Sequence, residues 1–118
     1  MKKILVVEDN EDIAETLALR LRIASYEVAV YHDGYDVLTV LHETEHPPDG
    51  IVLDLMLPGR SGYELLSSIK GKWPEVRVFI FSSHQELEKT FPRTWIEGFF
   101  IKTDGIEKLI EAMDRVLK

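Results

Sequence analysis

Short apolar runs alternate along the chain with segments in which apolar residues recur at helical spacing. Five of these runs are predicted strands: residues 4–7, 26–31, 51–54, 76–81 and 99–101. Most of them are continuous in Ile, Val, Leu and Phe, which is typical of strands that are buried on both faces. The run at 26–31 is more polar, and we expect it at an edge of the sheet.

The segments between the strands predict helices. Four segments carry an apolar stripe: Ile13, Leu17 and Leu21; Val37, Leu38 and Leu41; Leu65, Leu66 and Ile69; and Ile106, Leu109, Ile110, Met113 and Leu117. Such stripes form the buried face of an amphipathic helix. A fifth helix is expected to begin in residues 86–90, but the sequence Phe91-Pro92-Arg93 predicts that it is short or broken.

Start and turn signals place the ends of these elements. Asn10 is a candidate N-cap for the first helix, which we expect to end near Ala24. The stretches 61–64 and 104–107 have the spacing of capping boxes, led by Ser61 and Asp104. Pro58-Gly59 predicts a turn.

The alternation of strands and helices predicts an α/β fold. Five buried strands that alternate with five helices form a parallel sheet, with helices on both faces and right-handed crossovers. We expect a doubly wound sheet with the strand order 2-1-3-4-5. A chain of 118 residues fits one domain, residues 1–118.

Composition and charge narrow the classes of function. Hydrophobic residues make up 45% of the chain, which is enough for a packed core. The absence of cysteine excludes disulfides, thiolate metal sites and cysteine nucleophiles, and makes a reducing compartment the default. The net charge of -7, without a basic stripe, argues against direct binding to nucleic acid or to an anionic membrane. No apolar run reaches membrane-spanning length, and we expect a cytoplasmic protein.

Polar residues stand at the ends of four predicted strands. Asp54 interrupts an apolar run, and on its own it is equally well explained as a turn or capping residue. The neighbouring strands, however, end in Glu8-Asp9, in Ser82 and in Lys102. In the order 2-1-3-4-5, ligands bind outside the carboxyl ends of strands one and three. We therefore expect the three carboxylates to meet there, with the hydroxyl and the ammonium beside them.

Three carboxylates in one cleft repel one another unless some are protonated or a cation lies among them. Oxygen ligands in a shallow, hydrated site suit Mg²⁺ or Mn²⁺ better than Zn²⁺. An aspartate can act as a nucleophile and form an aspartyl-phosphate. A metal with a lysine and a hydroxyl is the set of groups that phosphoryl transfer needs. The residues thus predict a divalent-metal site beside a carboxylate that can act as a nucleophile.

The whole chain resembles the receiver domain of two-component response regulators. The resemblance rests, in chain order, on Glu8-Asp9, Asp54, Pro58 with Gly62, Ser82 and Lys102. It implies a flavodoxin-like fold and a phosphoprotein that is a signalling switch, not an enzyme, and that catalyses only its own phosphoryl transfer and dephosphorylation. It also implies a sensor histidine kinase or a phosphotransfer protein as a partner, and a downstream protein target. We expect a single receiver domain with no output domain in this chain.

The resemblance also implies a role for each acidic residue. Asp54 would accept a phosphoryl group from a phosphohistidine of the kinase. Asp9 and Asp54 would bind Mg²⁺ (or Mn²⁺) directly, together with the backbone carbonyl of Met56, and Glu8 would act through water.

The remaining site residues would respond to the phosphoryl group. Ser82 would hydrogen-bond it and draw its loop inward, and Lys102 would pair with it. Phe99 matches the aromatic switch position. Met56 and His84 occupy positions that tune how fast the phosphoryl group is lost. In this family the signal leaves by the face of the fourth helix, fifth strand and fifth helix.

The chain departs from the family pattern in several places. Lys102-Thr103 replaces a Lys-Pro pair that is often cis, so this bond is either trans or strained. Glu8 stands where aspartate is commoner. We expect the segment 91–95 to divide its aromatic residues between the core and the surface, and the histidines His32, His42 and His46 to lie on the surface.

Three other functions fit the pattern less well. A degenerate receiver would act by protein contacts without phosphorylation. A phosphatase of the haloacid-dehalogenase type would need a second aspartate where Met56 stands. A flavin- or nucleotide-binding module would need a phosphate loop after the first strand, where Glu8-Asp9 would repel phosphate.

Overall fold

The computed structural model describes residues 1–57 and 60–118. The predicted turn at Pro58-Gly59, the place of Pro58 in the family pattern and the side chain of Leu41 lie outside the described residues.

Five parallel strands form the central sheet. They are β1 (Lys3–Val7), β2 (Glu27–Tyr31), β3 (Gly50–Leu53), β6 (Arg77–Ser82) and β7 (Gly98–Ile101). Their order is β2-β1-β3-β6-β7, and a separate antiparallel pair is formed by β4 (Met56–Leu57) and β5 (Arg60–Ser61). Counted within the sheet this is the predicted order 2-1-3-4-5, with β2 at an edge as its polarity predicted.

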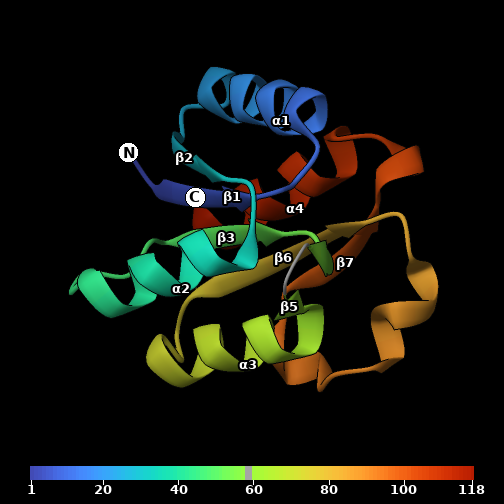
Figure 1. The fold of residues 1–118 in the computed structure, drawn as a ribbon. Helices are drawn as coiled ribbons and strands as arrows, with labels where there is room; N and C mark the ends of the chain where they lie inside the picture. Colours follow the sequence, from blue (N-terminus) through green and yellow to red (C-terminus); the bar gives the residue numbers. More distant parts are fainter. Residues whose placement is uncertain (58–59) are drawn as a thin grey trace.

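Helices cover both faces of the sheet. They are α1 (Glu11–Ile23), α2 (Gly34–Glu43), α3 (Gly62–Lys72) and α4 (Glu107–Leu117). Figure 1 shows α1 and α4 on one face and α2 and α3 on the other. The doubly wound α/β fold that the sequence predicted is therefore confirmed.

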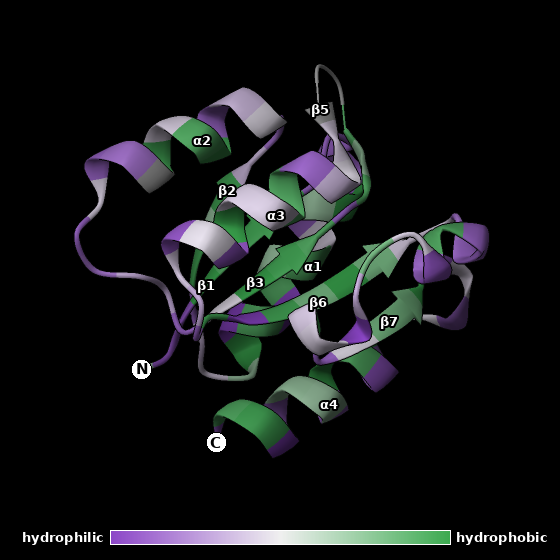
Figure 2. Cartoon of the chain, turned by 90° about the horizontal axis from the view of Figure 1, so that it is seen from below, coloured by the Kyte–Doolittle hydropathy of each residue, from purple (hydrophilic) through white to green (hydrophobic). Residues whose placement is uncertain are grey.

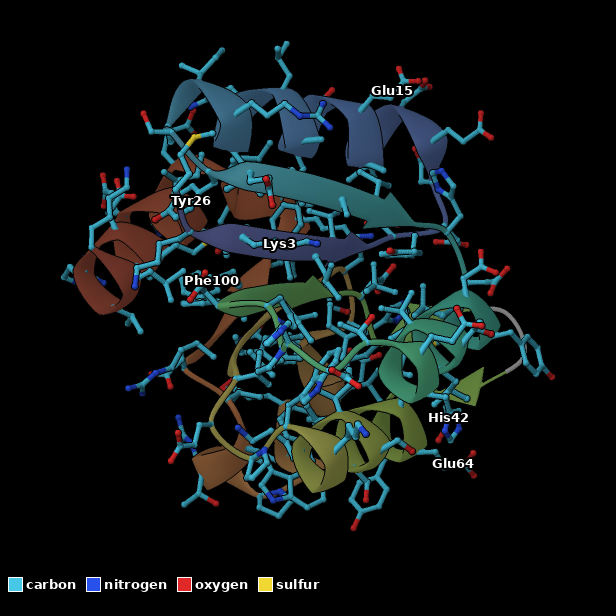
Figure 3. All side chains as sticks on the ribbon, turned by 90° about the vertical axis from the view of Figure 1, so that its left-hand side faces the viewer. Lys3, Glu15, Tyr26, His42, Glu64 and Phe100 are labelled. Atoms are coloured by element: carbon cyan, nitrogen blue, oxygen red, sulfur yellow. The ribbon has the colours of Figure 1, made fainter. Side chains whose placement is uncertain are left out.

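The core has two parts, one on each face. On the α1–α4 face the buried cluster includes Leu17, Leu21, Phe79, Leu109 and Met113, and on the α2–α3 face it includes Val37, Ile51, Leu65, Leu66, Ile69 and Ile80. Figure 2 shows apolar strands between helices that turn polar residues outward. Tyr26 belongs to the first cluster and Phe100 packs against it, and Figure 3 shows both beside α4. The described side chains of the predicted apolar stripes thus face the sheet.

Two of the three predicted helix starts are confirmed. The side chain of Asn10 accepts a hydrogen bond from the backbone N–H of Ile13 at 2.9 Å. The hydroxyl of Ser61 accepts one from the N–H of Glu64 at 3.1 Å. Gly62 lets the first turn of α3 approach the chain after β3, since a Cβ there would lie 2.9 Å from the Cα of Leu55.

The predicted capping box at Asp104 is wrong. Residues Lys102–Asp104 form a 3₁₀ turn, η3, and Gly105 then redirects the chain at a φ of 90°. The N-cap of α4 is Ile106, which makes no side-chain capping bond. Asp104 therefore belongs to the preceding turn and does not stand at the start of the helix.

The expectation of five helices also needs correction. In the described part of the chain, the segment between β6 and β7 forms only two 3₁₀ helices, η1 (Gln85–Lys89) and η2 (Arg93–Trp95). The predicted break at Phe91-Pro92 separates them. Phe91 is buried and Trp95 is half-buried, so the aromatic residues divide between core and surface as predicted. Among the described residues, no helix is long and apolar enough to span a bilayer.

Candidate functional site

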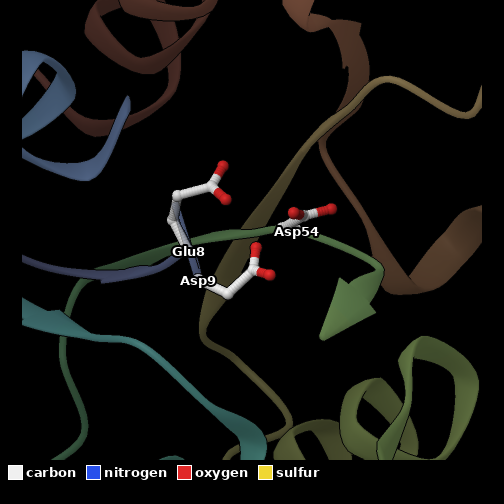
Figure 4. Close-up of side chains that lie close together, drawn as sticks. All are labelled: Glu8, Asp9 and Asp54. Atoms are coloured by element: carbon white, nitrogen blue, oxygen red, sulfur yellow. The ribbon is translucent and has the colours of Figure 1, made fainter. Parts of the chain in front are cut away.

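Three carboxylates meet at the carboxyl ends of β1 and β3. The register pairs Val7 with Leu53, so the residues that follow these strands lie side by side, and the backbone N–H of Asp54 donates to the Val7 carbonyl at 3.0 Å. Glu8 and Asp54 are buried, whereas Asp9 is exposed. Carboxylate oxygens of all three lie within 4.8 Å of one another, and Figure 4 shows the side chains leaving two strands to share one space. The predicted convergence is confirmed.

Lys102 directly follows the carboxyl end of β7, and its side chain reaches this cluster. Its Nζ lies 2.5 Å from Oε1 of Glu8 and 3.0 Å from Oδ2 of Asp54. Burial by itself would lower the pKa of the Lys102 ammonium, but the hydrogen bonds to Glu8 and Asp54 outweigh burial and raise it. The site therefore holds a fixed positive charge between two buried carboxylates.

Burial makes the Glu8 carboxyl a weaker acid. Desolvation raises the pKa of Glu8 to about 7, the Lys102 hydrogen bond opposes that rise, and the Asp54 charge adds to it. A single ammonium is therefore not enough to restore the ordinary acidity of Glu8. A second cation near these oxygens would favour the ionised form.

Asp54 is held by both of its oxygens. Oδ1 accepts a hydrogen bond from the backbone N–H of Met56 at 3.1 Å, while Oδ2 binds Lys102. Met56 itself belongs to β4, and its side chain is exposed. The carboxylate is thus fixed in orientation at the end of its strand, and the side chain of Met56, two positions later, is open to solvent.

Ser82 ends β6 and is completely buried. Its hydroxyl accepts a hydrogen bond from the backbone N–H of His84 at 3.0 Å, which leaves the hydroxyl proton available to donate. The His84 ring turns away to Glu86, with Nδ1 and Oε1 3.1 Å apart. Phe99 in β7 is half-buried and packs against the α2–α3 part of the core.

The residues present fit a hard divalent cation. The cluster offers only carboxylate oxygens, which suit Mg²⁺ or Mn²⁺, and the exposed Asp9 leaves a side of the site open to water. Three carboxylates beside one ammonium also leave an excess of negative charge for a cation to neutralise. The acidic cluster thus points to divalent-metal binding.

Sequence reasoning missed the bonds that hold Glu8. The N–H of Asn10 donates to Oε2 of Glu8 at 3.2 Å, and Nδ1 of His32 lies 3.0 Å from its backbone carbonyl. His32 is exposed, as are His42 and His46, so all three lie on the surface as predicted. No spacing signal marks the His32 contact, because its two partners are 24 positions apart in the chain.

An apolar groove adjoins Asp9. It encloses about 540 Å³ and runs from Asp9 along the β4–β5 pair to Leu87 and Thr90. The exposed side chains of Met56 and Tyr63 border it, and Tyr63 stacks at a tilt on Trp95 with ring centroids 5.5 Å apart.

The peptide bond between Lys102 and Thr103 is trans, as no cis bond occurs in the described chain.

Known proteins share this architecture. The family model for the response regulator receiver domain matches residues 4–114. The response regulator protein TrrA from Thermotoga maritima, solved in complex with Mg²⁺-BeF, is 25% identical, with a TM-score of 0.88 and coverage of 99% of this chain and 100% of that chain. In its complex with the histidine kinase ThkA, TrrA matches with 24% identity, a TM-score of 0.83 and full coverage of both chains, 100% and 100%. A receiver domain protein (CheY-like) from Methanospirillum hungatei has 21% identity, a TM-score of 0.89 and coverage of 99% and 94%.

Proposed function

The chain belongs to the response regulator receiver domain family, and we propose that it is a phospho-accepting switch in which Asp54 takes a phosphoryl group from a phosphohistidine. One observation carries the proposal. Asp54 is buried at the end of β3 with one oxygen on a backbone N–H and the other on Lys102, within 4.8 Å of two further carboxylates. Receiver domains are signalling switches, and we do not expect turnover of a separate substrate.

The transfer moves a phosphoryl group between two side chains. An oxygen of the Asp54 carboxylate forms the new O–P bond while the N–P bond to the donor histidine breaks, and the imidazole nitrogen takes up a proton. The fixed orientation of the carboxylate favours in-line attack, because it does not have to be organised during the reaction. Lys102 already contacts Asp54 and is placed to pair with the new phosphoryl oxygens.

Mg²⁺, or Mn²⁺ in its place, would neutralise charge on the phosphoryl oxygens when bound. Asp9, Asp54 and the backbone carbonyl of Met56 would hold the ion directly, and Glu8 would act through water. Before the ion and the phosphoryl group arrive, Lys102 pairs with both Glu8 and Asp54 and offsets part of the negative charge of the cluster.

The response would begin at Ser82. Its buried hydroxyl has a proton to donate, so a phosphoryl oxygen on Asp54 can draw Ser82 and the following loop inward. Phe99, half-buried in β7, would repack as that loop moves. The change is a shift between two packings, biased by contacts that only the phosphorylated state offers. It would reach a downstream partner through the face formed by η1, η2, β7 and α4.

The upstream partner would be a sensor histidine kinase or a phosphotransfer protein. The structure of TrrA in complex with the histidine kinase ThkA supports this assignment, because the TrrA chain has the same fold over its full length. The match to TrrA in complex with Mg²⁺-BeF likewise supports a divalent ion at the acidic cluster.

Intact-mass spectrometry after incubation with Mg²⁺ and acetyl phosphate tests the proposal. We expect the wild-type protein to gain one phosphoryl group, and Asp54→Asn or a chelator to abolish the gain while the fold stays intact. Asp36→Asn, at an exposed position on α2, is the matched control and should label normally. Persistent labelling of Asp54→Asn at another residue would count against Asp54 as the acceptor.

A degenerate receiver is the second candidate. The replacement of a helix between β6 and β7 by two 3₁₀ helices favours it, because that segment belongs to the proposed output face. Mg²⁺ binding without any phosphoryl gain, from acetyl phosphate or from a cognate kinase, would select this candidate.

A further inference from the structure

His32 contacts the acidic pair from outside the carboxylate cluster. We propose that it is a positioning residue, which strengthens divalent-cation binding by fixing the main chain at Glu8-Asp9. The inference deepens the proposed function, because it rests on a divalent ion at the acidic cluster. It concerns a bond to a backbone carbonyl and assigns the imidazole no place among the metal ligands.

The contact continues the β1–β2 ladder by one rung. Val7 and Tyr31 form the last residue pair of the two strands, and the N–H of Glu8 donates to the Tyr31 carbonyl at 3.0 Å. Beyond that bond the partner is a side chain, since Nδ1 of His32 lies 3.0 Å from the Glu8 carbonyl oxygen. A carbonyl oxygen can only accept, so Nδ1 carries the proton and donates.

This rung secures the end of β1 on the side that faces β2. On the other side, the N–H of Asp54 donates to the Val7 carbonyl at 3.0 Å. Lys102 and the N–H of Asn10 hold the Glu8 carboxylate, but neither bond is to the Glu8 carbonyl. The His32 bond is thus the one described contact of this carbonyl that ties the main chain of the acidic pair to the neighbouring strand.

Repulsion within the cluster gives that bond its effect. The carboxylates lie within 4.8 Å of one another, so in the absence of an ion their charges favour splaying of the chain at residues 8 and 9. A chain that splays must be ordered again when the ion binds, and that ordering reduces affinity. Fixing the Glu8 carbonyl in advance removes part of this cost.

Titration with Mg²⁺, followed by calorimetry and by the amide shifts of residues 8 and 9, tests the inference. His32→Leu removes the donor, and we expect the dissociation constant for Mg²⁺ to rise about five-fold, or about 1 kcal/mol. His32→Asn places an amide N–H where Nδ1 stands and should restore the affinity to within about two-fold. His42→Leu, at another exposed histidine, is the matched control and should bind as the wild type.

Two results would overturn the inference. One is a His32→Leu protein that binds Mg²⁺ like the wild type. The other is a His32→Asn protein as weak as His32→Leu, because that would mean the imidazole itself is needed. His32→Ser, which also lacks a donor that reaches the carbonyl, repeats the test if His32→Leu is poorly folded. A wild-type protein that binds Mg²⁺ but takes no phosphoryl group would contradict the proposed function and leave the His32 result standing.

Discussion

The two sides of the site are built differently. The acidic side consists of β1, β3 and the residues after them, and every residue of β3 is buried between two neighbouring strands. The carboxy-terminal side consists of residues 82–106, in which η1, η2 and η3 contain no buried residue and all four residues of β7 are half-buried. Elements with few buried contacts open at a lower free energy. The difference indicates a rigid acceptor that faces a segment able to change its packing.

The substitution with the largest expected effect removes a buried aromatic side chain that holds the carboxy-terminal side to the core. Phe91 lies between η1 and η2 and is 6% exposed, in the α2–α3 core. Phe91→Ala should lower the free energy of unfolding by about 3 to 4 kcal/mol, because it leaves a cavity under the segment. Chemical denaturation measures the loss, with the exposed Lys89→Ala as control. A cost below about 1 kcal/mol would show that the segment is not held to the core at this point.

Lys102→Ala tests the charge by which Lys102 joins the two sides. Without the ammonium, Glu8 and Asp54 remain as buried carboxylates without a cation, so the metal-free protein should lose about 2 kcal/mol of stability, and Mg²⁺ should recover most of it. We expect phosphorylation by acetyl phosphate to persist while the accompanying shift of the Phe99 amide falls by more than about half. An unchanged Phe99 response would remove Lys102 from the switch.

The pH dependence of Mg²⁺ binding should show a smaller effect, and it tests the acidic side alone. Burial raises the pKa of Glu8 to about 7, so the metal-free folded protein keeps a proton there that the unfolded chain has already lost. The stability that this proton contributes to the metal-free protein is present at acidic pH and is lost as pH rises towards 7. Mg²⁺ must displace the proton, so its affinity should rise about ten-fold between about pH 6 and pH 8.

Calorimetry in buffers of different ionisation enthalpy would count the protons released. Glu8→Gln cannot be ionised and should flatten the profile. A profile that keeps its slope in Glu8→Gln would assign the proton to another group.

Much of the fold follows from local patterns that tertiary contacts did not overrule. The predicted runs form five strands in the predicted order, and the caps at Asn10 and Ser61 form as predicted. The capping box at Asp104 failed for a tertiary reason. Lys102 opens the η3 turn and contacts Glu8 and Asp54, and Asp104 lies within the same turn, so α4 begins only after Gly105. The spacing of residues 104–107 carries no information about contacts with Glu8 and Asp54, so it could not predict this turn.

What the sequence determined by itself is the alternation of buried strands and amphipathic helices, and with it the meeting of Glu8, Asp9 and Asp54 at one edge of the sheet. Those features depend on periodicity and on the rules of parallel sheets. Only the tertiary structure decided that Lys102 bridges two carboxylates, that the segment after β6 forms 3₁₀ helices, and that His32 reaches the Glu8 carbonyl. These depend on distances between residues far apart in the chain, which are set by the packing of the whole domain.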